Sequence, residues 1–136
     1  MTTIDPTPVS ANLAVSADSD RRLISAHRVQ GTAVYDRNDN RLGTVEDVMI
    51  DKRSGQVAFA VMSFGGFLGL GERHHPLPWS VLTYEPRLGG YVVGLTREEL
   101  EGAPHYEPSA AADLSDTEGR RVYDHYKQRP FYLDVA

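Results

Sequence analysis

The sequence contains no cysteine, which excludes disulfides, thiolate metal sites, iron–sulfur clusters and a cysteine nucleophile. It also lacks an excess of basic residues: 14 Lys and Arg stand against 19 Asp and Glu, giving a formal net charge of −5. This balance argues against a protein that binds nucleic acid or an anionic membrane directly through a basic surface. A chain without cysteine fits a reducing compartment, so we expect a cytoplasmic protein.

Long hydrophobic runs are also missing. The most apolar stretch, Val57 to Met62, is far shorter than the ~20 residues that cross a bilayer. Residues 1–24 have no apolar segment and no early positive charge, so they do not have the pattern of a signal peptide. We therefore expect no membrane insertion, with membrane association only through a partner.

The chain of 136 residues has the length of one domain with terminal segments. Residues 1–24 are rich in Thr, Ser, Ala, Asp and Pro, which predicts a disordered N-terminal tail. From 25 to 108, short apolar runs alternate with turn residues, and this pattern predicts one compact domain. Residues 109–136 are expected to form a linker, a C-terminal helix and an aromatic tail.

The domain from 25 to 108 is predicted to be mainly β, a small barrel of about six short, mostly antiparallel strands. Val45 and Val48 are three residues apart, which breaks strand alternation and predicts a β-bulge between them. Pro76 and Pro78 cannot donate backbone hydrogen bonds, so their strand is expected at a sheet edge or bulge. The expected strands are 29–35, 42–51, 56–64, 73–78, 81–85 and 91–95.

The strand expected over 56–64 is apolar on both faces, so it needs cover on two sides. One side can face a barrel core. The other side requires a helix, the tail or another subunit. The sequence does not decide between these covers.

Two capping boxes predict helices after the last strand. Thr96 and Ser115 are each followed three residues later by Glu, which is the pattern of a helix N-terminus. The first predicts a short helix that ends before Pro104. The second predicts a C-terminal helix from about 116 to 128, with Pro130 after its end.

No group of residues in the sequence matches a catalytic constellation, so we expect a protein that is not an enzyme, with no cofactor and no metal site. His74 and His75 are the obvious candidates for metal ligands. Adjacent side chains on a strand point to opposite faces, however, so these two imidazoles are not expected to share one ion.

Two apolar segments are candidates for contact with a protein partner. The glycine-rich segment 65–71 contains no phosphate-binding motif, and its large side chains are apolar. The tail from 123 to 132 is too rich in aromatic residues for a solvated segment, so we expect it to dock on something. The predicted partner-contact residues are Phe67, Leu68, Leu70, Tyr123, Tyr126, Phe131 and Tyr132.

Several short motifs in this order resemble the PRC-barrel domain family. They are GTVEDVMID at 43–51, SGQVAFAV at 54–61, GGFLGLG at 65–71, LPW at 77–79 and TREEL at 96–100, followed by Ala103-Pro104. The resemblance implies a compact β-barrel-like domain. In this family the domain occurs in the cytoplasmic part of the photosynthetic reaction centre H subunit and at the C-terminus of a ribosome maturation factor.

The resemblance implies a protein-docking module without catalysis of its own. We therefore predict a non-catalytic binding or scaffold module that docks on a protein partner and forms a homodimer, without direct contact to nucleic acid. One alternative is an accessory factor in RNA processing or ribosome assembly. The other is a soluble accessory factor of photosynthetic electron transfer.

Overall fold

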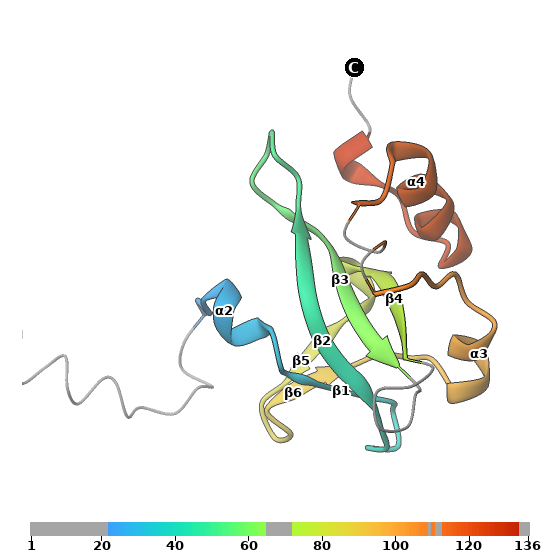
Figure 1. Ribbon diagram of the computed structural model, residues 1–136. Helices are drawn as coiled ribbons and strands as arrows, with labels where there is room; N and C mark the ends of the chain where they lie inside the picture. The colour runs from blue at the N-terminus through green and yellow to red at the C-terminus, as the bar shows by residue number, and fades with distance from the viewer. Residues whose placement is uncertain (1–21, 65–71, 109, 111–112, 134–136) are drawn as a thin grey trace, which may run out of the picture.

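Six strands form one sheet in the order β4-β3-β2-β1-β6-β5 in the computed structural model, which describes residues 22–64, 72–108, 110 and 113–133 (Figure 1). All neighbouring strands are antiparallel except β1 and β6, which are parallel. The predicted mainly-β class is confirmed, while the pairing within the described residues leaves the sheet open between its edge strands. The strands are β1 (Ala33–Tyr35), β2 (Arg41–Ile50), β3 (Val57–Phe64), β4 (Arg73–Pro78), β5 (Thr83–Glu85) and β6 (Gly90–Val92).

Within the residues that the structure describes, three α-helices and two short 3₁₀ helices accompany the sheet. Both capping boxes predicted from the sequence are present, Thr96 with Glu99 and Ser115 with Glu118. The helices are α2 (Ala26–Val29), α3 (Arg97–Glu101), α4 (Asp116–His125), η2 (Trp79–Val81) and η4 (Phe131–Leu133). Within the described segments, no helix has the length and apolar character that a membrane crossing needs.

The strand predicted over 29–35 is wrong at its start, because 26–29 form the helix α2. The Ser25 side chain accepts a hydrogen bond from the Arg28 backbone N–H and so caps this helix. Gly31 then turns the chain with a φ of +87°, which glycine adopts without strain. Only the last three residues of the predicted strand, Ala33–Tyr35, join the sheet.

Other boundaries also differ from the predictions. The predicted bulge between Val45 and Val48 is confirmed by a register shift between Val45 and Asp47. The C-terminal helix is shorter than predicted and ends at His125, because the chain turns at Lys127 with a φ of +58°. The predicted strands 81–85 and 91–95 are shortened to β5 and β6.

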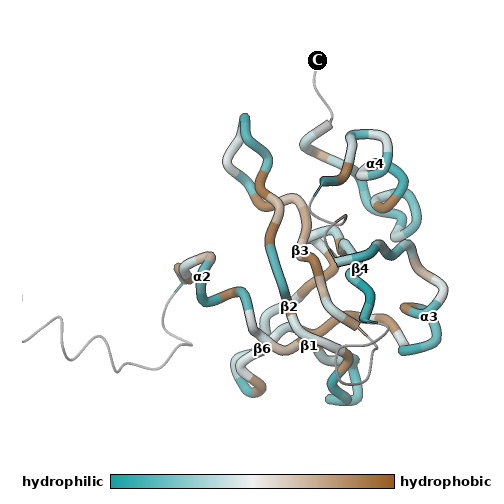
Figure 2. Tube along the Cα trace, in the orientation of Figure 1, coloured by the Kyte–Doolittle hydropathy of each residue, from teal (hydrophilic) through white to brown (hydrophobic). Residues whose placement is uncertain are grey.

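Both faces of β3 are covered by the same chain. Its inner face contributes Ala60, Met62 and Phe64 to the larger core, which also contains residues of β1, β2, β4, β6 and α3. Its outer face, marked by Phe59, packs against Val122 and other residues of α4. Figure 2 shows that α4 is mostly hydrophilic along its length, so only a narrow stripe of this helix meets the sheet. The cover that the apolar strand needed is therefore a helix of the chain itself.

The predicted edge position of β4 is confirmed by the strand order. The outward-pointing backbone of His74 exchanges two hydrogen bonds with Tyr106, of 2.9 and 3.0 Å. Because backbone direction alternates along a strand, Pro76 and Pro78 also present their backbone to this outer edge. Neither has an N–H group, so within β4 only His74 offers an outward donor.

Candidate binding surface

The C-terminal segment packs on the outer face of β3 through aromatic side chains. Tyr123 lies edge-on to Phe59 with ring centroids 5.1 Å apart, and its hydroxyl donates a 2.6 Å hydrogen bond to the Ala58 carbonyl oxygen. Tyr132 contacts both rings, with centroids 5.8 Å from Phe59 and 5.4 Å from Tyr123. A Cβ at Gly119 would lie 2.5 Å from the Tyr132 hydroxyl oxygen, so glycine at this position makes room for the tail.

A groove of about 540 Å³ lies between the start of β3, η2 and the C-terminal segment. The Ser80 hydroxyl donates a 2.7 Å hydrogen bond to the side-chain carbonyl of Gln128, which ties η2 to the chain after α4. Trp79 is held edge-on against Tyr91 of β6, with centroids 5.5 Å apart. These two contacts hold η2 and Trp79 in place, so the spacing of the groove walls that they form is fixed. The lining residues are Gln56, Val57, Trp79, Ser80, Tyr123, Gln128, Arg129 and Phe131.

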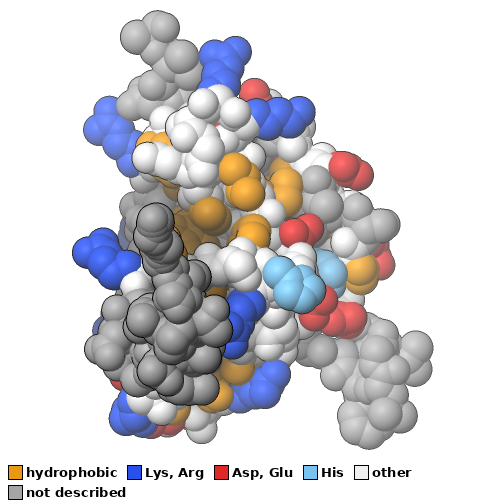
Figure 3. All heavy atoms as spheres, turned by 90° about the vertical axis from the view of Figure 1, so that its left-hand side faces the viewer, with side chains coloured by type: hydrophobic (Ala, Val, Ile, Leu, Met, Phe, Trp, Pro, Cys, Tyr) orange, Lys and Arg blue, Asp and Glu red, His pale blue; other side chains and the backbone are white. Residues whose placement is uncertain are grey.

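Large apolar side chains near this groove are exposed. Phe131 lines it and is 40% exposed, and Ile50, which pairs with Val57 of the groove wall, is 52% exposed. On the face turned toward the viewer in Figure 3, apolar side chains gather in the middle of the surface, below basic side chains at the top. Exposed apolar side chains beside a groove are typical of a surface that contacts another molecule.

The predicted partner-contact residues divide into three groups. Phe67, Leu68 and Leu70 lie outside the described residues. Tyr123 is 1% exposed, and Tyr126 and Tyr132 are partly buried, so all three pack in the cluster between the C-terminal segment and β3. Phe131 is the tail residue with the most exposed side chain among those predicted.

The phenol groups of the tail are desolvated. Burial raises the pKa of Tyr132 to about 12, with the nearby negative charge of Asp116 acting in the same direction. Burial also raises the pKa of Tyr126, and its hydroxyl has no hydrogen-bond partner within the described structure. These hydroxyls are neutral at physiological pH, which favours a packing role over acid–base chemistry.

Ile50, Val57 and Trp79 were not predicted as contact residues. A second register shift in the β2–β3 pairing falls between Met49 and Ile50, next to the exposed side chain of Ile50. Nothing in the sequence marks this shift, because Lys52 to Gly55 have the composition of an ordinary hairpin turn. Trp79 stands between the predicted strands 73–78 and 81–85, and a large aromatic residue in such a short connection could have been suspected.

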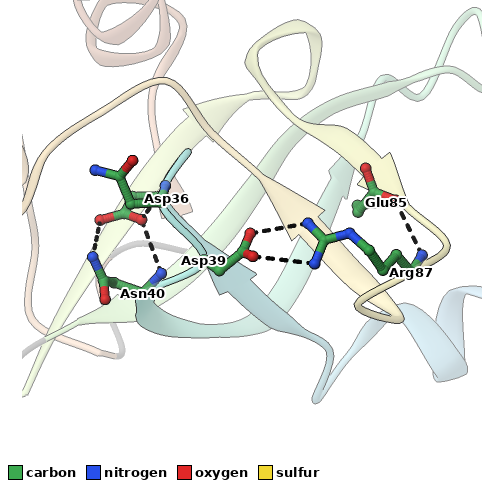
Figure 4. A network of polar contacts seen from close by, with 6 residues as sticks. Asp36, Asp39, Asn40, Glu85 and Arg87 are labelled. Carbon is green, nitrogen blue, oxygen red and sulfur yellow. Dashed lines mark hydrogen bonds and ion pairs between the residues drawn. The ribbon is translucent and has the colours of Figure 1, made fainter.

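A second groove of about 440 Å³ lies at the other end of the sheet and is mixed in charge. Arg87 donates two 3.1 Å hydrogen bonds to the carboxylate of Asp39, and its backbone N–H donates one to Glu85 (Figure 4). In the adjoining turn, Asp36 accepts hydrogen bonds from Asn40, which lower its pKa. Both partners of the Asp39–Arg87 pair are largely exposed, so this network is consistent with a role in fixing the turns.

The two adjacent histidines point to opposite faces of β4, as predicted. His75 is fully buried on the inner face and His74 lies on the other face, 3.9 Å from the Glu72 carboxylate. Across residues 22–64, 72–108, 110 and 113–133, no three His, Asp or Glu side chains gather in a way that could hold a metal ion.

This chain is similar to a known domain family and to individual known proteins. A family model described as "PRC-barrel domain" matches residues 22–100. An uncharacterized protein of Deinococcus radiodurans is 23% identical over 114 residues, covering 79% of this chain and 40% of that protein. A solved structure of a putative 16S ribosomal RNA processing protein, RimM, from Pseudomonas aeruginosa is 21% identical with a TM-score of 0.37. That match covers 60% of this chain and 49% of the other, so the chain spans less than half of either protein.

Proposed function

This chain belongs to the PRC-barrel domain family, and we propose that it is a protein-binding module whose groove between β3, η2 and η4 receives a second copy of the chain. The observation that carries the proposal is the groove with exposed apolar side chains at its rim. The buried aromatic contacts beneath it make the surface rigid before binding, which lowers the entropic cost of association.

The occupant follows from what lies beside the groove. Ile50 projects from the end of β2, and its paired residue Val57 forms part of the groove wall. A two-fold interface brings the same patch of both copies together, so the groove of one copy can face the apolar projection of the other. Each copy then inserts its projection into the groove of the other. The need for cover on β3 no longer supports a dimer, because α4 supplies that cover.

The test is the oligomeric state of the full chain, measured by sedimentation velocity from micromolar to near-millimolar concentration. The wild-type protein is expected to show a reversible monomer–dimer equilibrium. Ile50→Thr keeps a β-branched side chain on the strand and removes apolar surface, and Phe131→Ser removes the aromatic rim. Each is expected to raise the dissociation constant about tenfold, as loss of an interface anchor does.

Leu23→Ser is the matched control. Leu23 is also an exposed apolar residue, at 91%, but it lies outside the groove and its rim. Its replacement is expected to leave the equilibrium unchanged. A wild-type chain that stays monomeric over the whole range, or a Leu23→Ser variant that dissociates as readily as Ile50→Thr, contradicts the proposal. The RNA-processing and photosynthetic alternatives, and the cytoplasmic location, stay predictions.

A further inference from the structure

The side chain of His75 is buried in an unusual way for a histidine. It is fully buried, and neither ring nitrogen has a hydrogen-bond partner among the described residues. Its ring lies edge-on to Phe64 of β3, with centroids 5.4 Å apart, and against His105 at 5.4 Å. Buried polar groups are nearly always hydrogen-bonded, so an orphaned imidazole at this position calls for an explanation.

The residues that cover His75 form a strap, which we define as 103–106. The strap lies along the outer edge of β4 and is held by the two backbone hydrogen bonds between Tyr106 and His74. Ala103 is buried at its start, and the exposed ring of His105 lies on His75. The Tyr106 side chain packs with the cluster that includes α4. No other residue of a described strand pairs with the strap.

The ionisable groups around His75 are almost all basic side chains. On its own strand are Arg73 and His74, and on the strap is His105; each acts against a proton on the ring. Behind Phe64, the guanidinium of Arg97 from α3 lies 5.4 Å above that aromatic ring. The carboxylate of Glu72 lies 3.9 Å from His74, on the other face of β4. α4 packs against β4 from the opposite face of the sheet.

We propose that His75 and His105 form a pH-sensitive latch, which keeps the strap on edge strand β4 at neutral pH and releases it in acid. While His75 is neutral, its ring packs against the ring of His105. A proton on His75 would place a charge in the apolar core, where His105 also opposes it. Lifting the strap exposes His75 to water and separates the two rings, which relieves both penalties.

The size of the effect follows from proton linkage. Burial lowers the pKa of His75 from 6.5 to about 4, and electrostatic repulsion by His105, Arg73 and His74 adds to this. The backbone of Pro104 on the strap lies near enough to oppose the shift, although it does not meet the geometry of a hydrogen bond to either ring nitrogen. In the open state the ring regains its ordinary value. Opening therefore takes up a proton, and its equilibrium constant rises about 30-fold between about pH 7.5 and pH 5.

The experiment is amide hydrogen exchange on the full chain, corrected for the intrinsic effect of pH on exchange. The Tyr106 and His74 amides report on the strap, and the Val45 amide, bonded to the Thr32 carbonyl, reports on the body of the sheet. Protection at Tyr106 and His74 is expected to fall about 30-fold over this pH range and to stay well below the protection of Val45 at both pH values, because Val45 exchanges only when the whole sheet unfolds. Equal protection of Tyr106 at both pH values, or protection of Tyr106 as high as that of Val45, overturns the latch.

His75→Phe tests whether protonation of His75 causes the pH dependence, since phenylalanine keeps an aromatic ring against Phe64 but does not titrate. In this variant the strap amides are expected to lose their pH dependence. His27→Gln, at an exposed histidine of α2, is the control and is expected to behave as wild type. A pH dependence that persists in His75→Phe refutes the proposal. A direct NMR titration of the wild-type His75 ring needs no variant: a midpoint well below 6.5 supports the latch, and an ordinary midpoint refutes it.

Discussion

The hydroxyl of Tyr123 donates a 2.6 Å hydrogen bond to the carbonyl oxygen of Ala58, which joins α4 to β3 at a defect in the sheet. Ala58 lies at the register shift between β2 and β3 and has no paired residue in either neighbouring strand. A buried carbonyl without a ladder partner is costly unless another donor reaches it. The C-terminal helix therefore completes the hydrogen bonding of the sheet as well as its packing.

Tyr123→Phe is expected to lower the free energy of unfolding by about 1–3 kcal/mol, because it leaves the buried Ala58 carbonyl without a donor. The ring and its contact with Phe59 are kept. Urea denaturation at neutral pH measures the change as a shift in midpoint with an unchanged slope. An unchanged midpoint would mean that water replaces the phenol.

Tyr126→Phe is the matched substitution three residues later. The Tyr126 hydroxyl is buried and has no hydrogen-bond partner within the described structure. Its removal takes away an unsatisfied polar group and leaves no other group without a hydrogen-bond partner. The free energy of unfolding is therefore expected to stay the same or to rise. Loss of stability comparable to that of Tyr123→Phe would show that the Tyr126 hydroxyl has a partner.

Gly119 and Tyr132 are expected to be energetically coupled. Alanine at 119 gains about 1 kcal/mol of helix propensity over glycine, but its Cβ would lie 2.5 Å from the Tyr132 hydroxyl oxygen. Gly119→Ala should therefore stabilise α4 by about 1 kcal/mol only when Tyr132→Phe has removed that oxygen. A double-mutant cycle measured by urea denaturation gives the coupling, and strict additivity would contradict it.

His75 is expected to make stability depend on pH. Its pKa in the folded chain is lowered to about 4, so its contribution is complete above pH 6.5 and is lost as the pH falls toward 4. This one group should reduce the free energy of unfolding by about 2 kcal/mol between pH 7 and pH 5. The difference between wild type and His75→Phe, each measured at both pH values, isolates it from the carboxylates. Parallel pH profiles would show that His75 does not contribute.

Local patterns in the sequence predicted the meander β2–β3–β4 and both capped helices. The Val45–Val48 spacing located the bulge, and the opposite orientations of His74 and His75 followed from strand alternation. These features depend on residues close to one another in the chain. Local geometry and the hydrophobic pattern are sufficient to set them.

Features that depend on distant residues were not predictable in this way. The parallel pairing of Val34 with Tyr91 joins segments that no local signal connects. The helix α2 is local, but its four residues are too few to show a periodic pattern. The groove depends on how η2, β3 and the tail meet, and the orphaned ring of His75 depends on the strap that arrives from 103–106. Neither has a sequence motif.

The two prolines of β4 have a consequence for the growing chain. Tyr106, which covers the outer edge of β4, is 28 residues beyond the end of that strand. At ordinary rates of translation the edge stays uncovered for about 1–6 s after β4 has been made. During that interval Pro76 and Pro78 present no backbone N–H group at the edge. Neighbouring nascent chains on the same messenger RNA therefore find only the His74 N–H group as a donor there. Synthesis can thus proceed at high local concentration without sheets joining edge to edge.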